Sequence, residues 1–227
     1  MREKIKRLLL HLIAPTRCPL CGDFIRPADR FCEECGAGLR EWSGKFSVPG
    51  SDSFTAAFEY NGTVKPAVML LKNGMADNAD YALGGALFDR LSAEGILACT
   101  DIIQPVPMTA EDIMERGYNQ AELICRHIGN LSGLPVADCI RKQADTLPQK
   151  TLNKAQREVN LRGAFAVTAP DTVKGSRILL VDDVCTTGST LAELTWLLKS
   201  SGAKAVYCAA CCKTPPVKDE EELPDNG

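Results

Sequence analysis

Apolar residues in this chain form short unbroken runs and longer runs with helical spacing. The short runs predict strands at 54–60, 101–107, 136–140, 164–167, 178–184 and 205–210. Helical spacing predicts helices at 2–13, 64–71, 81–91 and 121–131, and a further helix after residue 190. Strands that alternate with helices are typical of an α/β fold with a mostly parallel sheet and helices on both faces.

The stretch from Arg177 to Thr190 joins the strongest strand signal to candidate chemistry. Asp182 and Asp183 are expected to end the strand. Small residues then follow, namely Thr186, Thr187, Gly188, Ser189 and Thr190. Such a loop before a helix points backbone N–H groups at an anion. Acids beside a phosphate would repel it unless they hold sugar hydroxyls or a divalent cation, so the pattern predicts a sugar phosphate with Mg²⁺.

The same stretch also fits the start of a helix. Thr190 and Glu193 are expected to form a capping box that starts the helix. The alternative to a ligand site is a buried strand with an acidic end and an ordinary N-cap. No P-loop or dinucleotide motif occurs in the chain. The pattern instead resembles the phosphoribosyl pyrophosphate loop of type I phosphoribosyltransferases.

Four of the eleven cysteines form two C-x2-C knuckles, each followed by glycine: Cys18, Cys21, Cys32 and Cys35. Four thiolates fill a tetrahedral site, so the spacing predicts structural rather than catalytic zinc. The alternative is a redox-active pair, which would not need two knuckles of equal design.

Composition narrows the class of protein. The chain has 227 residues, of which 45% are hydrophobic and 24% charged, and its net charge of −3 offers no general attraction for nucleic acid. No apolar run is long enough for a transmembrane segment, and the run 8–14 is a poor signal peptide. Together with clustered cysteines, this favours a cytoplasmic location.

Three further parts of the chain could contribute to binding or catalysis. The helix 2–13 carries leucines among basic residues, and we expect it to dock them on the neighbouring domain, with a membrane surface as the alternative. Lys72 is either functional or a solvated helix end. Residues 141–162 are basic and lack apolar periodicity, which is typical of either a disordered segment or a functional lid; as a closing hood, the segment offers Lys150 and Arg157 as candidates.

The order of motifs resembles the ComF family over residues 15–213. The matching features are the two knuckles, Pro105–Pro107, Arg116–Gln120, the stretch from Leu147 to Gln149 with Arg157 and Asn160, Gly163–Phe165, and the Asp182 loop. The resemblance implies a zinc-bearing module before a type I phosphoribosyltransferase-like domain, and a link to natural competence. The implied layout is an amino-terminal helix (1–17), a zinc-binding knuckle module (18–40), a linker (41–53), the phosphoribosyltransferase-like domain (54–213) and an acidic disordered tail (214–227).

The resemblance also implies roles for the site residues. Asp182 and Asp183 would hold the ribose hydroxyls of phosphoribosyl pyrophosphate, and residues 186–190 its 5′-phosphate. Arg116 would lie near the pyrophosphate with Mg²⁺. One hypothesis is a phosphoribosyltransferase acting on an unidentified acceptor. The alternative is a non-enzymatic accessory protein that binds single-stranded DNA. Other DNA-uptake proteins and a second copy of the chain, in a homo-oligomer, are further candidate partners.

Overall fold

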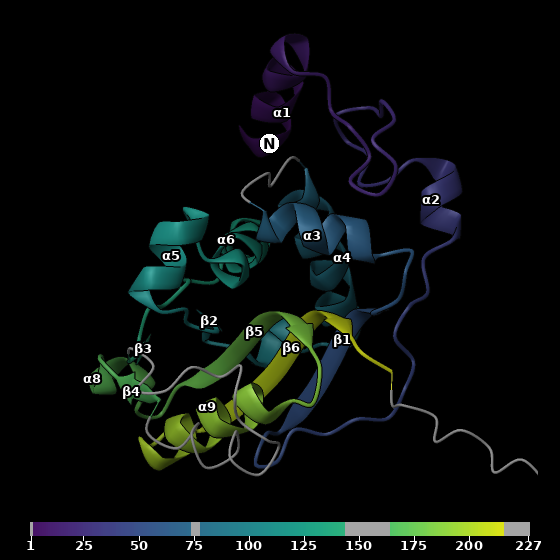
Figure 1. The fold of residues 1–227 in the computed structure, drawn as a ribbon. Coiled ribbons are helices and arrows are strands. Elements are labelled where there is room, and N and C mark those ends of the chain that lie inside the picture. Colours follow the sequence, from purple (N-terminus) through teal and green to yellow (C-terminus); the bar gives the residue numbers. More distant parts are fainter. Residues whose placement is uncertain (1, 74–77, 144–163, 216–227) are drawn as a thin grey trace, which may run out of the picture.

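The fold is built on a four-stranded parallel sheet with the order β1-β6-β5-β2 (Figure 1). The computed structural model describes residues 2–73, 78–143 and 164–215. The strands are β1 (Ser53–Glu59), β2 (Ile102–Pro105), β5 (Arg177–Cys185) and β6 (Ala205–Lys213). β5 and β6 lie in the middle of the sheet and are covered on both faces, which explains their long apolar runs.

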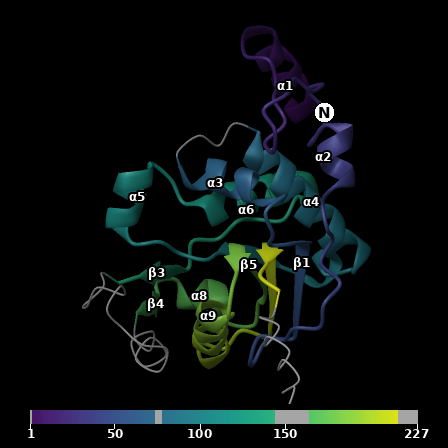
Figure 2. The same ribbon diagram turned by 45° about the vertical axis from the view of Figure 1, so that its right-hand side comes forward.

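Helices cover both faces of this sheet (Figures 1 and 2). One face carries α3 (Lys65–Lys72), α4 (Ala79–Ala93) and α6 (Gln120–Ser132). The other carries α9 (Ser189–Ser200) and the short α8 (Pro170–Val173). The expected α/β class with helices on both faces is therefore confirmed.

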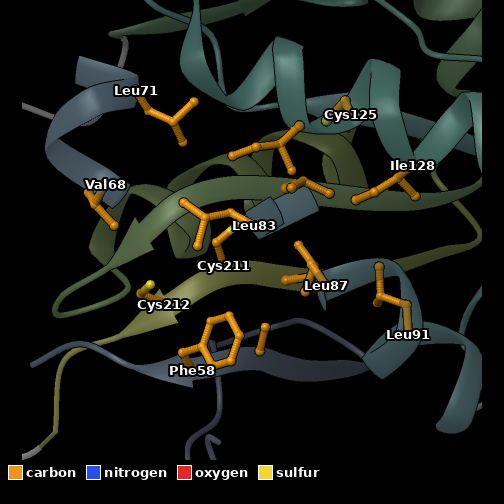
Figure 3. Packing of buried hydrophobic residues seen from close by; sticks show 14 of the residues in the cluster. Phe58, Val68, Leu71, Leu83, Leu87, Leu91, Cys125, Ile128, Cys211 and Cys212 are labelled. Atoms are coloured by element: carbon orange, nitrogen blue, oxygen red, sulfur yellow. The ribbon is translucent and has the colours of Figure 1, made fainter. Parts of the chain in front are cut away.

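Each face has its own apolar core. Figure 3 shows the first, where side chains of α3, α4 and α6 pack on β1, β5 and β6. Leu83, Leu87 and Leu91 are fully buried there. Each such leucine contributes roughly 1.5–3 kcal/mol by leaving water. The second core lies under α9 and includes Leu191, Leu194 and Leu198 of that helix.

The sheet changes its direction of growth between β5 and β2. After β5 the chain adds β6 on one side of β5. After β2 the chain continues in the opposite direction across the sheet, where Val136 forms a parallel bridge with Ile103 of β2. The carboxyl ends of β5 and β2 thus flank a topological switch point, where open α/β sheets bind ligands.

Residues 136–140 do not form the continuous strand that was expected. After the bridge at Val136, the side chain of Gln104 accepts from the Cys139 N–H at 2.9 Å and so replaces the next rung of the ladder. The chain then enters a separate hairpin of β3 (Ile140–Lys142) and β4 (Phe165–Val167).

Two boundaries near the predicted site also differ from expectation. β5 continues through Asp182 and Asp183 to Cys185, because β6 stays paired with it as far as Lys213. α9 begins at Ser189, after Gly188 with φ of +80° as its N-cap residue, so the expected capping box at Thr190 is wrong. A left-handed glycine already sets the start of this helix.

A short helix, α5 (Ala110–Arg116), follows β2. The Thr109 hydroxyl caps it by accepting from Asp112 N at 3.1 Å, and Gly117 ends it with φ of +86°. Asn119 caps α6, since its side chain accepts from Ala121 N at 2.9 Å.

The amino-terminal parts pack on the first face of the sheet through α4. They comprise α1 (Arg2–Ile13) and α2 (Glu33–Ala37). A separate short 3-10 helix, η1 (Leu97–Cys99), lies between α4 and β2 in the chain. The ring of Phe31 meets Phe58 of β1 edge-on at 6.0 Å, and Leu20 and Leu39 pack against the same core. The knuckle module is therefore docked on the sheet domain.

Four apolar side chains of α1 do not dock as expected. Leu8, Leu9, Leu12 and Ile13 are 56–86% exposed. Arg7 makes the contact instead: its guanidinium lies 3.4 Å from the centre of the Tyr81 ring and donates to Pro27 O at 2.8 Å. No helix of the described residues has the length and apolarity needed to cross a bilayer.

Candidate active site and metal centre

Asp182 and Asp183 lie together near the carboxyl end of β5; we call them the acid pair. Asp182 Oδ1 accepts from Asp183 N, and Asp183 Oδ1 accepts from Val184 N, each at 2.8 Å. These contacts fix each carboxyl group but use only one oxygen of each. The second oxygen of Asp183 is buried and has no hydrogen bond among the described residues; Lys72 Nζ lies 3.4 Å from it.

The electrostatics of the acid pair are unfavourable without a ligand. Burial and the neighbouring charge of Asp183 raise the pKa of Asp182 well above its ordinary range, although Lys72 acts in the opposite direction. A cation or a set of hydroxyl donors beside the pair would relieve this repulsion. The acid pair is therefore a place where a bound group would be stabilised.

A pocket of about 180 Å³ opens over the acid pair. Its charged lining residues are Lys72, Asp112, Arg116, Asp182 and Asp183. A second hollow, lined by Met69, Lys72, Asn73, Glu115 and Arg116, adjoins the first through the two residues they share, Lys72 and Arg116. Cations and carboxylates thus line the same pocket, which suits a ligand that carries both hydroxyls and phosphates.

The amino end of α6 closes one wall of the pocket. Asn119 donates to Val106 O at 2.9 Å and so joins this helix to the turn after β2. Gln120 also lines the pocket, and its Nε2 is buried without a hydrogen-bond partner in the described chain. A buried amide with an unused donor is costly, and a ligand oxygen would satisfy it.

The structure brings together three residues singled out from the sequence, since Asp182, Asp183 and Arg116 line one pocket. Lys72, which the sequence left open, lines it with them. Arg116 stands on the last turn of α5 and is exposed. Gln120 was missed, although its place beside the Asn119 cap was a signal that could have identified it.

The predicted phosphate-binding residues Thr186, Thr187, Gly188, Ser189 and Thr190 follow the acid pair but do not line this pocket. Thr186 and Thr187 are exposed, and the Thr187 hydroxyl lies 2.9 Å from that of Ser189. Within the described chain, the backbone N–H groups of Thr186, Thr187 and Gly188 donate no hydrogen bond. The hood candidates Lys150 and Arg157 lie outside the described residues.

The four knuckle cysteines converge on one point. The Sγ atoms of Cys18, Cys21, Cys32 and Cys35 all lie within 4.8 Å of one another. Cys21 Sγ and Cys32 Sγ are 3.7 Å apart, and a tetrahedron with metal–sulfur distances of about 2.3 Å has edges of about 3.8 Å. The cluster therefore fits a metal ion held by four sulfurs.

The two knuckles reach this point by different backbone routes. In the first, Gly22 turns with φ of +84° and donates to Cys18 O at 2.9 Å. In the second, Gly36 lies inside α2 and donates to Cys32 O at 2.8 Å. Burial and then the adjacent thiols raise the pKa of Cys35, whereas a metal would favour the thiolates.

Comparisons with known proteins identify relatives of this chain. Residues 113–225 match the family model of the phosphoribosyl transferase domain. The DNA utilization protein YhgH of Escherichia coli K12 is 30% identical over 203 residues, which cover 88% of this chain and 85% of that protein. Competence protein F of Haemophilus influenzae is 33% identical, with 83% of this chain and 82% of that protein covered.

Two further matches extend the comparison. Competence protein ComFC of Bacillus subtilis is 27% identical, covering 90% of this chain and 78% of that protein. Among solved structures, a purine phosphoribosyltransferase from Pyrococcus horikoshii Ot3 matches 62% of this chain and 79% of its own, at 22% identity and a TM-score of 0.38.

Proposed function

Since this chain belongs to the ComF family and has its phosphoribosyltransferase-like domain, we propose that it binds phosphoribosyl pyrophosphate with Mg²⁺ at the pocket over the acid pair. The observation that carries the proposal is the meeting of Asp182 and Asp183 with Lys72 and Arg116 at a topological switch point. Carboxylates suit the ribose hydroxyls, and the two cations suit the pyrophosphate.

Each side chain has a distinct role in this proposal. Asp182 and Asp183 accept hydrogen bonds from the ribose 2′- and 3′-hydroxyls. The N–H groups of the loop 186–190 bind the 5′-phosphate, which lies next to the ribose. Mg²⁺, when bound, neutralises charge on the pyrophosphate oxygens.

Lys72 and Arg116 are suited to hold the leaving pyrophosphate. Lys72 is about one-third exposed and lies 3.4 Å from Asp183, so its ammonium group can turn toward a phosphate in the pocket. Arg116 ends α5 beside it. We propose Asp182, Asp183 and Arg116 as the catalytic residues of a phosphoribosyl transfer, because charge builds on the pyrophosphate as the bond to ribose C1 breaks.

Titration calorimetry with phosphoribosyl pyrophosphate, with and without Mg²⁺, tests the proposal. We expect binding that requires Mg²⁺. Arg116→Gln should weaken binding of phosphoribosyl pyrophosphate about tenfold or more while leaving ribose 5-phosphate nearly unaffected, since only the former carries the pyrophosphate. Arg126→Gln is the matched control, because Arg126 pairs with Glu122 on the surface of α6. Absence of binding by the unaltered protein would overturn the proposal.

We propose zinc as the metal of the four-cysteine cluster, in a structural role. Support comes from the all-sulfur ligand set and from the sulfur spacing, which suit tetrahedral zinc. All four ligands come from the protein, so no open position is left for a substrate.

A second function is supported by the names of the relatives, which refer to DNA utilization and competence. We propose that this chain also acts in DNA uptake or use, with single-stranded DNA as the partner. Titration with a single-stranded oligonucleotide at about 50 and 200 mM salt tests this, because phosphate contacts weaken steeply with salt. No binding at the lower salt concentration would contradict it.

A further inference from the structure

The segment 40–48 joins the knuckle module to the sheet along the edge of β1 (Figures 1 and 2); we call it the edge segment. Glu41 forms an antiparallel bridge with Phe58, and Trp42 N donates to Ala57 O at 3.1 Å. Trp42 and Val48 are buried. The edge segment is thus a fixed part of the fold, although its sequence reads as a linker.

Phe46 of the edge segment packs on the loop between β5 and α9. A Cβ atom placed on Gly188 would lie 2.7 Å from Phe46 Cζ, so the ring occupies the space that a side chain would need. The ring is itself held edge-on by Phe54, with centroids 4.9 Å apart. Gly188 is therefore required for this contact as well as for its φ of +80°.

Lys213 approaches the same loop from the end of β6. It is only 4% exposed, and its Nζ donates to Thr186 O and Thr214 O at 2.7 Å each. The ammonium group lies 4.3 Å from the centre of the Phe46 ring and 5.9 Å from that of Trp42. Among the described residues, no carboxylate lies within 4.0 Å of it, so backbone carbonyls and ring faces surround its charge.

The hydrogen bond to Thr186 O determines where the next N–H group points. The peptide bonds of the described chain are trans, so the carbonyl of Thr186 and the N–H of Thr187 point in opposite directions. Because Lys213 holds that carbonyl, the Thr187 N–H is directed away from the ammonium group. That N–H has no acceptor in the described chain and is available to an anion.

We propose that Phe46 and Lys213 are positioning residues that hold residues 186–188 in the shape that binds a phosphate monoester. This inference rests on the proposed function and extends it. Lys213 orients the loop and adds a buried positive charge beneath it, and Phe46 covers the ammonium group and fixes Gly188. The edge segment thereby joins the phosphate loop to the module that carries the four cysteines.

The test compares Lys213→Met with Lys45→Met, which removes an exposed lysine of the edge segment. Calorimetry measures the affinity for inorganic phosphate and for phosphoribosyl pyrophosphate plus Mg²⁺. Both affinities should fall about tenfold or more in Lys213→Met and stay unchanged in the control. In the unaltered protein, phosphate should shift the amide resonances of Thr187 and Gly188, and this shift should be lost in Lys213→Met. The near-UV circular dichroism spectrum of Lys213→Met should stay unchanged, which a general loss of structure would not allow.

Phe46→Leu keeps an apolar contact and decides the matter if Lys213→Met fails to fold. We expect it to weaken phosphate binding in the same direction by a smaller factor. If the unaltered protein binds the sugar phosphate and the position 213 and 46 variants bind it equally well, this inference fails while the proposed function stands. If the unaltered protein binds neither probe, both fail.

Discussion

The two ends of strand β5 hold acidic residues in opposite ways. At the amino end, Asp101 accepts from Arg177 N at 2.8 Å, Nε at 3.0 Å and Nη2 at 2.6 Å. These bonds lower the pKa of Asp101 to about 2. At the carboxyl end, the acid pair is crowded, and burial with the charge of Asp183 raises the pKa of Asp182.

This difference separates a structural acid from a functional one. Asp101 has an arginine that matches its two oxygens, so the carboxylate and its partner complete each other within the fold. The acid pair has one lysine at 3.4 Å for two carboxylates and keeps a buried oxygen without a hydrogen bond among the described residues. Groups that the fold leaves unsatisfied are the ones a ligand can satisfy, and they concentrate at functional sites.

Removal of the metal is expected to have the largest effect on stability, because the four thiols are a further group of like side chains crowded at one point, where a bound cation would stabilise them. Structural zinc contributes roughly 10–16 kcal/mol in small zinc domains. Elemental analysis of protein purified without added metal should give close to one zinc per chain. Cys18→Ser with Cys35→Ser should abolish it, and Cys99→Ser, an exposed cysteine outside the cluster, should not. Less than about a tenth of an equivalent in the unaltered protein would contradict the prediction.

Replacing the acid pair should separate binding from stability. Asp182→Asn with Asp183→Asn preserves volume and removes both charges, so affinity for phosphoribosyl pyrophosphate should fall by about 2 kcal/mol or more, roughly 30-fold. The melting temperature should stay the same or rise slightly, because mutual repulsion is removed. Calorimetry and thermal melting measure the two effects.

Asp171→Asn on α8 is the control for that variant, since Asp171 is exposed and outside the pocket. A large loss of stability in the double variant, or unchanged binding, would mean that the acid pair is structural. The acidic residues at both ends of β5 would then serve the stability of the fold.

Local sequence signals were sufficient for part of this site. The acid pair follows an apolar run and precedes small residues, and the knuckle spacing identifies four thiols that do converge. The cap of α6 by Asn119 could also be predicted from the sequence, because a capping side chain accepts a hydrogen bond from a backbone N–H only two or three residues further along. In each case the interaction that matters is short in sequence.

The parts that could not be predicted depend on contacts between distant segments. Lys72 reaches Asp183 from α3, and Phe46 reaches Gly188 from a segment whose composition suggests only a linker. β5 runs past the acids because β6 pairs with it, which no local pattern in residues 177–185 reports. Tertiary pairing overrides local preference at these positions.

Removing the carboxylate of Asp101, which pairs with Arg177 at the amino end of β5, should reduce the free energy of unfolding by an amount that depends on pH. The folded-state pKa of Asp101 is about 2 and its unfolded value about 3.9, so its contribution is present above pH ~4 and is lost as the pH falls toward 2. Asp101→Asn should therefore lower the melting temperature at pH 7 but not near pH 2. Asp29→Asn, which breaks an exposed pair with Arg26, should change it little. An equal effect of both variants at pH 7 would contradict this reading.

Replacing Asp182 alone should also change stability with pH, in the opposite direction. A raised folded-state pKa means that, above an unfolded value of about 3.9, the folded state keeps the proton that the unfolded state releases. Stability therefore falls as the pH rises through this window, by at most about 1.4 kcal/mol per pH unit. Asp182→Asn removes this term, so its stability relative to the unaltered protein should increase from pH 4 to pH 7. Denaturant unfolding at several pH values measures this difference, with Asp171→Asn as the control. A difference that stays constant with pH would show that Asp182 ionises normally in the fold, and the contrast between the two ends of β5 would then rest on hydrogen bonding alone.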